Sequence, residues 1–97
     1  TALSKATKQS NMKASLDISM YPLDADYEQP ILDFIKRLQM YKNLTVKTNP
    51  LSTHVFGEYE ALMTAMQREM KISFDQHENV VMVLKIINAD RDLEDFL

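Results

Sequence analysis

The chain has 97 residues, enough for one domain with a modest hydrophobic core. Cysteine is absent, which excludes disulfide frameworks, thiolate chemistry and cysteine-based zinc sites, while 45% apolar and 26% charged residues are typical of a globular domain. The net charge of −3 without a cluster of lysines or arginines argues against a nucleic acid partner, and the longest apolar run, Val80 to Leu84, is too short to cross a membrane. We therefore expect a small cytoplasmic domain.

The first eleven residues, Thr1 to Asn11, carry no periodic pattern of apolar side chains and include two lysines but no acid. A secretory signal needs an apolar stretch of about 7–15 residues, which this segment lacks. We expect a flexible leader over residues 1–11 and a single folded domain over residues 12–97.

A first strand begins at Lys13, because apolar and polar residues alternate strictly from there to Tyr21. The apolar members of this alternation are Ala14, Leu16, Ile18 and Met20, and the polar members are Ser15, Asp17, Ser19 and Tyr21. Pro22 cannot donate to a strand ladder and is expected to end the strand.

A first helix is predicted between Tyr27 and Tyr41, where apolar residues recur at helical spacing. Asp24 or Asp26 can cap its N-terminus, and Pro30 is tolerated in the first turn. Lys42-Asn43 suits its end, because asparagine tolerates a left-handed turn.

A hairpin follows, with strands predicted over Leu44 to Thr48 and Ser52 to Phe56 around an Asn49-Pro50 turn. The single glycine, Gly57, closes the second of these strands. A second helix then carries an apolar stripe from Tyr59 to Phe74, and residues 75–79 are expected to form a turn. Val80 to Ile87 is the last predicted strand, and the acidic tail over residues 88–97 is expected to form a short helical turn.

The order of elements is therefore β-α-β-β-α-β, which is typical of the α+β ferredoxin-like fold. This fold is a four-stranded antiparallel sheet with both helices on one face. The last strand would leave Val81, Val83 and Ile87 on the face without helices, as an apolar patch of the kind that marks an interaction site. Either the acidic tail shelters this patch, or two or more copies associate through it as a dimer or tetramer, which is the alternative that we favour.

Several chemistries are disfavoured by the residues present. His54 and His77 lie 23 residues apart with no carboxylate at ligand spacing, so no metal site is expected. Ser52, Thr53 and His54 follow one another along a strand, where side chains alternate between faces, so we expect no nucleophilic triad. One glycine cannot build a phosphate-binding loop, and the loop after the first strand is acidic rather than basic. No catalytic residue is predicted.

A polar cluster is predicted where the first strand ends beside the hairpin, because these two strands are neighbours at the centre of a ferredoxin-like sheet. Its members are Ser19, Tyr21, Asn49, Ser52 and Thr53. Hydroxyls, an amide and an aromatic ring suit a small heteroaromatic ligand. The alternative is that the hairpin residues only bond to their own backbone.

Two segments resemble the thiamine-binding YkoF-like family of small ferredoxin-like domains. They are Ile18-Ser19-Met20-Tyr21-Pro22-Leu23 and the longer run from Thr48 to Tyr59, Thr-Asn-Pro-Leu-Ser-Thr-His-Val-Phe-Gly-Glu-Tyr. The resemblance spans roughly residues 12–92. It implies non-catalytic binding of thiamine or its hydroxymethylpyrimidine moiety near a sheet-to-sheet interface, and self-association of a single-domain member. No further cofactor is implied.

Such a ligand can be matched to side chains in this sequence. Tyr21 or Phe56 can stack on the pyrimidine or meet the thiazolium cation, and Asp17 or Glu58 can accept from the exocyclic amine. The candidate ligand-binding residues are Asp17, Ser19, Tyr21, Asn49, Ser52, Thr53, His54, Phe56 and Glu58.

The face that His54 and Phe56 occupy decides whether both belong to this site. If Val55 and Gly57 face the helices, both side chains point into the site; if Phe56 is in the core, Tyr21 is the only aromatic ligand. We prefer the first alternative, because Gly57 leaves room for a helix to pack closely.

The leading hypothesis is an oligomeric carrier or sensor of thiamine or hydroxymethylpyrimidine that is not an enzyme. The acidic loop makes thiamine diphosphate a poorer ligand than thiamine. One alternative is a ligand-responsive regulatory or scaffold subunit that binds another protein. Another is a small dimeric ferredoxin-like enzyme in which His54 or Asp17 acts as a base.

Overall fold

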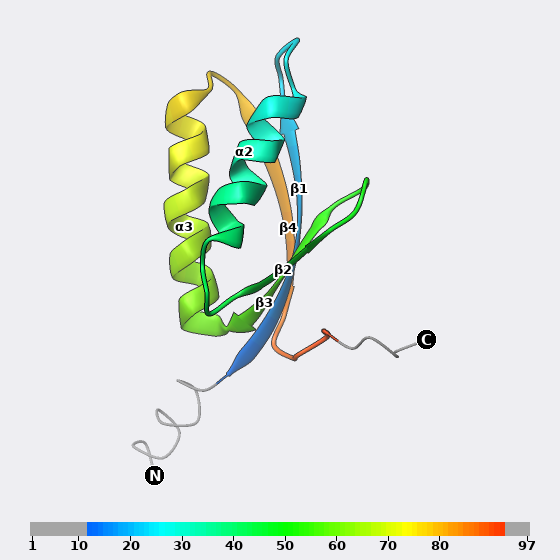
Figure 1. Ribbon diagram of the computed structural model, residues 1–97, viewed down its shortest axis with the longest axis vertical. Coiled ribbons are helices and arrows are strands. Elements are labelled where there is room, and N and C mark those ends of the chain that lie inside the picture. Colours follow the sequence, from blue (N-terminus) through cyan, green and yellow to red (C-terminus); the bar gives the residue numbers. More distant parts are fainter. Residues whose placement is uncertain (1–11, 93–97) are drawn as a thin grey trace.

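The computed structural model describes residues 12–92, so the expected flexible leader over residues 1–11 and the last five residues of the acidic tail lie outside the described part. Its elements are β1 (Lys13–Pro22), α2 (Glu28–Gln39), β2 (Thr45–Thr48), β3 (Thr53–Glu58), α3 (Tyr59–Gln76) and β4 (Val80–Ile87). The strands form one antiparallel sheet in the order β2-β3-β1-β4, and both helices lie on the same side of it (Figure 1). The ferredoxin-like fold is confirmed.

The alternation along β1 sorts its side chains between two faces of the sheet. Leu16 lies opposite Val55 on β3 and Ile86 on β4, and this set faces the helices. Asp17 lies opposite His54 and Lys85, and this set occupies the other side, which we call the open face. Directly opposed residues of antiparallel strands share a face, so the register fixes the face of every strand residue.

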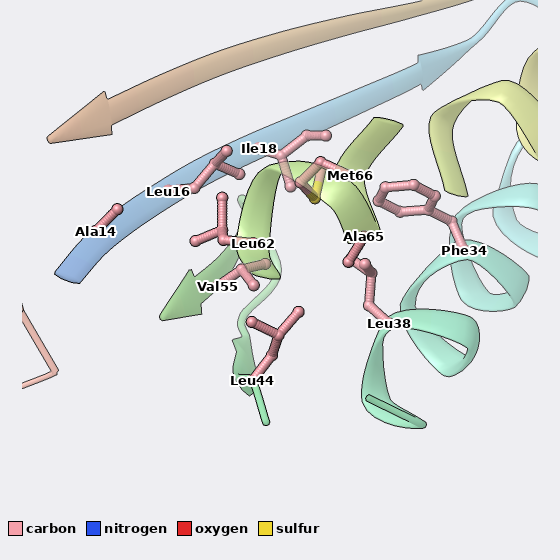
Figure 2. Close-up of a cluster of buried hydrophobic side chains, with 10 residues drawn as sticks. All are labelled: Ala14, Leu16, Ile18, Phe34, Leu38, Leu44, Val55, Leu62, Ala65 and Met66. Carbon is pink, nitrogen blue, oxygen red and sulfur yellow. The ribbon is translucent and has the colours of Figure 1, made fainter. Parts of the chain in front are cut away.

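The hydrophobic core fills the layer between the sheet and the helices. Side chains converge there from β1, β3, both helices and the segment before β2 (Figure 2). The buried apolar residues are Ala14, Leu16, Ile18, Phe34, Leu38, Leu44, Val55, Leu62, Ala65 and Met66. These residues recur at period two on the strands and at helical spacing on α2 and α3, as burial of one face of each element requires.

The start of α2 differs from the expectation. Its N-cap residue is Tyr27, and neither Asp24 nor Asp26 caps the helix; Asp24 instead accepts a hydrogen bond from the Ala25 amide at 2.6 Å. The helix therefore begins without a side-chain cap. Pro30 is its third residue, where a missing amide hydrogen costs no helical hydrogen bond.

Two other boundaries differ from the expectation. α3 continues to Gln76, so the turn predicted over residues 75–79 begins two residues later. In the tail, residues 88–92 form no helical turn; the Ser15 hydroxyl instead donates to the Ala89 carbonyl at 2.7 Å and accepts from the Arg91 amide at 2.8 Å. Residues 88–92 thus cover Ser15 but leave Val83 exposed.

The helices are joined by four side chains that we call the interhelix network: Arg37, Tyr41, Glu69 and Ser73. The Arg37 guanidinium donates to Glu69 Oε1 at 2.7 Å and to Ser73 Oγ at 2.7 Å. Tyr41 donates its hydroxyl hydrogen to the other carboxylate oxygen of Glu69 at 2.6 Å. Every oxygen of this buried carboxylate is therefore hydrogen-bonded, as a buried charge requires.

Candidate functional site

A pocket of about 490 Å³, here called the end pocket, lies where β1 ends beside the hairpin tip and the start of α2. The backbone pairing explains its position. β1 pairs with β3 only as far as Ile18 opposite Thr53, but continues along β4 to Pro22 opposite Val80. The hairpin therefore diverges from the last residues of β1 (Figure 1), and the space between them is the pocket.

The end pocket has an apolar floor and an aromatic rim. Core-facing residues such as Ile18, Met20 and Phe34 form the floor. Tyr21 and Tyr27 lie at the rim with exposed fractions of 53% and 54%. None of the described residues that line it is an aspartate, glutamate, lysine, arginine or histidine. The pocket therefore offers aromatic surface and neutral hydrogen-bonding groups, but no fixed charge.

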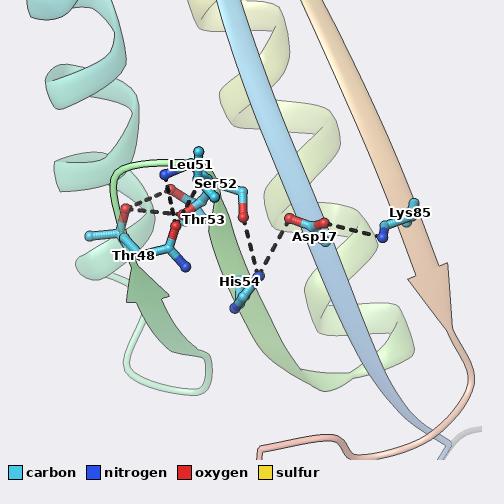
Figure 3. Close-up of polar contacts among 8 residues, drawn as sticks. Asp17, Thr48, Leu51, Ser52, Thr53, His54 and Lys85 are labelled. Carbon is cyan, nitrogen blue, oxygen red and sulfur yellow. Dashed lines mark hydrogen bonds and ion pairs between the residues drawn. The ribbon is translucent and has the colours of Figure 1, made fainter.

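The polar residues predicted to converge here do line the end pocket, but they are not equally available. Asn49 Oδ1 accepts from the amides of Leu51 and Ser52 at 2.8 and 3.0 Å. The Thr48 and Thr53 hydroxyls lie 3.0 Å apart (Figure 3). Asn49 thus bonds to the backbone of its own hairpin, as the alternative interpretation held, whereas the Thr53 hydroxyl meets the side chain of Thr48.

Ser19 and Tyr21 differ from the hairpin residues. Within residues 12–92, no side-chain hydrogen bond is formed by the Ser19 hydroxyl or by the phenol groups of Tyr21 and Tyr27. These hydroxyls from β1 and the α2 start therefore remain available to a ligand.

A second group of polar residues, here called the open-face cluster, lies on the open face and comprises Asp17, His54 and Lys85. The Asp17 carboxylate is 3.6 Å from His54 Nε2 and, through its other oxygen, 3.6 Å from Lys85 Nζ (Figure 3). Asp17 Oδ1 is buried and has no hydrogen-bond partner in the described part of the chain. The distances exceed those of good charge-assisted hydrogen bonds, so the cluster is only loosely paired.

Ser52 adjoins this cluster, with its Oγ 3.3 Å from His54 Nε2. The expectation that alternation separates Ser52 from His54 is wrong, because residues two apart on a strand share a face. A catalytic relay would need the serine and the carboxylate on different ring nitrogens. Here Ser52 and Asp17 both approach Nε2, so the relay geometry is not formed.

The open-face cluster borders a shallow hollow of about 480 Å³, here called the open-face pocket. Val55 is fully buried, so its neighbours His54 and Phe56 lie on the open face, with their rings edge to face at 6.4 Å. Gly57 does face the helix layer, but the residue close to it is Leu44 rather than a helix residue. A Cβ at position 57 would lie 2.6 Å from Leu44 Cδ2.

The candidate residues from the sequence therefore divide between two places. Ser19, Tyr21, Asn49, Ser52 and Thr53 line the end pocket. Asp17, His54 and Phe56 line the open-face pocket. Glu58 lies apart from both, opposite Lys13 where β3 meets α3.

Among the lining residues that sequence reasoning did not assign to a ligand site are Tyr27, Lys85 and Arg91. Tyr27 was assigned only to the apolar stripe of a helix, although its place before the first helical turn could have indicated an exposed ring. The alternation along the last strand places Lys85 on the open face, so a signal for Lys85 was present in the sequence. Arg91 lies in a tail that has no periodic pattern, so no signal pointed to it. Among the described residues, no group of three histidines or acids is arranged to hold a metal ion, and no helix is long and apolar enough to span a membrane.

Comparisons with family models and with curated protein sequences find no match to this chain. Several solved structures are similar. A Streptococcus pneumoniae protein is 27% identical with a TM-score of 0.75, over 82% of this chain and 90% of that one. A hypothetical protein of Methanocaldococcus jannaschii is 22% identical with a TM-score of 0.71, over 88% and 89% of the two chains.

A third similar structure is a Thermotoga maritima protein that is provisionally assigned to thiamine biosynthesis or salvage. It is 21% identical with a TM-score of 0.70, over 76% of this chain and 81% of that one. The likenesses confirm that the chain has the fold of these small proteins, one of which is thiamine-related.

Proposed function

We propose that this chain binds a small heteroaromatic ligand, thiamine or its hydroxymethylpyrimidine moiety, in the end pocket and does not transform it. The observation that carries the proposal is an uncharged pocket with two exposed tyrosines and unpaired hydroxyls at its rim. Its volume of about 490 Å³ lies within the range of about 300–1,000 Å³ that is usual for small-ligand sites.

The side chains of the end pocket fit the chemistry of an aminopyrimidine. Tyr21 and Tyr27 can stack on a flat ring, while the Ser19 hydroxyl can pair with a ring nitrogen or with the exocyclic amine. A phosphate would meet no lysine, arginine or histidine among the described lining residues. We therefore expect thiamine diphosphate to bind more weakly than thiamine.

Two further observations support this class of ligand. The segments that resemble the thiamine-binding YkoF-like family, around Tyr21 and around Ser52, are far apart in the sequence but meet at the end pocket. A structurally similar protein is assigned to thiamine biosynthesis or salvage. A non-catalytic role is consistent with a pocket whose described lining lacks a carboxylate, an imidazole and an ammonium group that could transfer protons.

The proposal includes self-association through the open face. Val81, Val83 and Ile87 are exposed there beside the open-face cluster. The cluster carries charges of both signs on Asp17 and Lys85, so two identical faces can pair negative with positive across a twofold axis. A different protein in this place is the alternative, and in that case the chain alone would not associate through its open face.

Calorimetric titration with hydroxymethylpyrimidine, thiamine and thiamine diphosphate tests ligand binding. Tyr21→Ala should weaken binding of the first two ligands about 5- to 150-fold, because stacking on an aromatic side chain contributes about 1–3 kcal/mol per ring. Tyr59→Ala is the matched control, since Tyr59 is also exposed but lies outside the end pocket.

Ligand-dependent stability gives a second measure of the same site. Hydroxymethylpyrimidine at about 100 times its Kd should raise the free energy of unfolding by about 2.7 kcal/mol. The proposal fails if none of the three ligands releases heat or stabilises the fold, or if Tyr21→Ala and Tyr59→Ala have the same effect.

A further inference from the structure

β4 is an edge strand with the composition of an interior strand. Seven of its eight residues are apolar, and side chains on both of its faces are exposed. Val83 on the open face is 53% exposed, and Leu84 and Ile86 on the helix side are 37% and 47% exposed. Apolar residues on both faces of a strand are typical of strands that have neighbours on either side.

The backbone of β4 also has hydrogen-bonding groups directed outward. The Leu23 amide donates to the Asn79 carbonyl at 3.0 Å, so these opposed residues form a hydrogen-bonded pair of the antiparallel ladder. Such hydrogen-bonded pairs alternate along the ladder with pairs that form no hydrogen bonds to each other. Pro22 and Val80 are therefore a pair without hydrogen bonds, which suits a proline because it has no amide hydrogen. Val80, Met82, Leu84 and Ile86 consequently turn their N–H and C=O groups away from β1.

The opposite edge of the sheet, β2, is protected against pairing with another strand, unlike β4. β2 is only four residues long, and its Lys47 forms an ion pair with Asp92 from the tail. Short edge strands that carry lysine and are crossed by another segment resist pairing with further strands. Within residues 12–92, β4 has no comparable cover: it is twice as long, and its single charged residue, Lys85, pairs with Asp17 of β1 rather than with the tail.

α3 extends the apolar surface on the helix side of this edge. Glu69 and Ser73 bond to Arg37, so this side of α3 faces α2. Helical spacing places a second flank about a quarter turn away, directed away from α2. This flank comprises the exposed Tyr59 and Phe74 and the partly buried Met63 and Met70. Met63, Met70 and Met82 of β4 pack against the same core.

We propose that two copies of this chain pair through β4, antiparallel and about a twofold axis, to form one continuous eight-stranded sheet. The pairing would bond the outward N–H and C=O groups and bury apolar side chains on both faces. It is independent of the ligand in the end pocket. The open face would remain accessible, and the partner's strand would add a wall to the open-face pocket beside Lys85, Ile86 and Ile87.

The occupant is a second copy because β4 is complementary to itself. Opposed residues must share a face, so the twofold axis passes through a single residue. An axis at Leu84 opposes Lys85 to Val83 of the partner subunit, and an axis at Val83 opposes it to Val81 of the partner subunit. In both pairings the Lys85 side chains of the two copies are not opposite each other. Only one residue of β4 is charged, so the strand offers little to attract an acidic partner protein.

Single cysteines test the pairing, because the chain has none of its own. Leu84→Cys should form an intermolecular disulfide under mild oxidation if the axis is at Leu84. An equal mixture of Leu84→Cys and Met82→Cys chains should form the mixed disulfide if the axis is at Val83. Opposed Cα atoms are about 5.5 Å apart in such pairs, within disulfide reach. Stacked sheets are about 10 Å apart, and both positions face the helix side, so open-face packing cannot link them.

Sedimentation gives the complementary measurement and its control. At about 100 μM the wild-type chain should have at least twice the 11.2 kDa mass of one copy, and four times that mass when the open faces of two β4-paired dimers also pack together. Leu84→Lys should lower the association through β4 at least about tenfold. Thr45→Lys, on the protected β2 edge, should leave it unchanged. The proposal is overturned if the wild-type chain is monomeric, or if it associates but neither cysteine experiment gives a disulfide.

Discussion

The molecule contains two clusters of charged side chains that differ in how completely their atoms are paired. In the interhelix network Glu69 is only 5% exposed, and both of its carboxylate oxygens accept hydrogen bonds at 2.6–2.7 Å from Arg37 and Tyr41. A buried carboxylate with all its acceptors satisfied stabilises one relative position of the two helices.

The open-face cluster has the opposite character. The Asp17 carboxylate lies 3.6 Å from His54 Nε2 and 3.6 Å from Lys85 Nζ, and Asp17 Oδ1 has no hydrogen-bond partner in the described part of the chain. The difference indicates that charge serves the fold between the helices, whereas on the open face charge is left available to another molecule. The free energies of unfolding of variants in each cluster test this distinction.

Glu69→Ala should lower the free energy of unfolding by about 3 kcal/mol, the largest effect expected here. The change leaves the half-buried Arg37 without its carboxylate and Tyr41 without its acceptor. Urea unfolding measures the loss. Glu60→Ala is the matched control on an exposed turn of the same helix, and a similar loss in both variants would contradict a structural role for the network.

Tyr41→Phe should lower the free energy of unfolding by about 1–2 kcal/mol at pH 7, because it removes one hydrogen bond to a charged group. The hydrogen bond to Glu69 raises the pKa of Tyr41 above its ordinary value of 10.0, and burial and the negative charge of Glu69 raise it further. A raised pKa in the folded state favours the protonated phenol. Its stabilising contribution is therefore complete below about pH 10 and is lost as the pH rises through the folded-state pKa.

Urea unfolding between about pH 8 and pH 11 checks the sign of this effect. The difference in unfolding free energy between wild type and Tyr41→Phe should shrink toward the alkaline end. A difference that stays constant or grows would show that Glu69 does not stabilise the protonated form of Tyr41.

Asp17→Asn should change the free energy of unfolding by no more than about 0.5 kcal/mol, the smallest effect of the series. Its partner Lys85 is largely exposed, and exposed ion pairs contribute little. A double-mutant cycle with Lys85→Met isolates the pair, at a fixed protein concentration so that association is held equal. A coupling energy above about 1 kcal/mol would remove the distinction between the two clusters.

The sequence was informative wherever one element alone decides the outcome. Strict alternation along β1 assigned Leu16 to the core and Asp17 to the open face, and the element order predicted the fold. Contacts between elements were out of reach: Arg37 and Glu69 are 32 residues apart, and no local pattern pairs them. The end pocket was predicted in part, since Ser19 and Tyr21 were placed beside the hairpin from topology.

The division of the site into two places could not be predicted. It depends on where the β1–β3 pairing stops, which follows from the geometry of the hairpin rather than from its residue types. For the same reason Phe56 and Tyr21 were assigned to one site, although they line different pockets.

The backbone has a further consequence for how this chain can vary. Within residues 12–92, no residue has a positive φ angle, including Gly57. Its turns are therefore built from conformations open to any L-amino acid, so their residues can be exchanged during evolution without backbone strain. Gly57 is constrained instead by the side chain of Leu44, and we expect substitutions at these two positions to occur together.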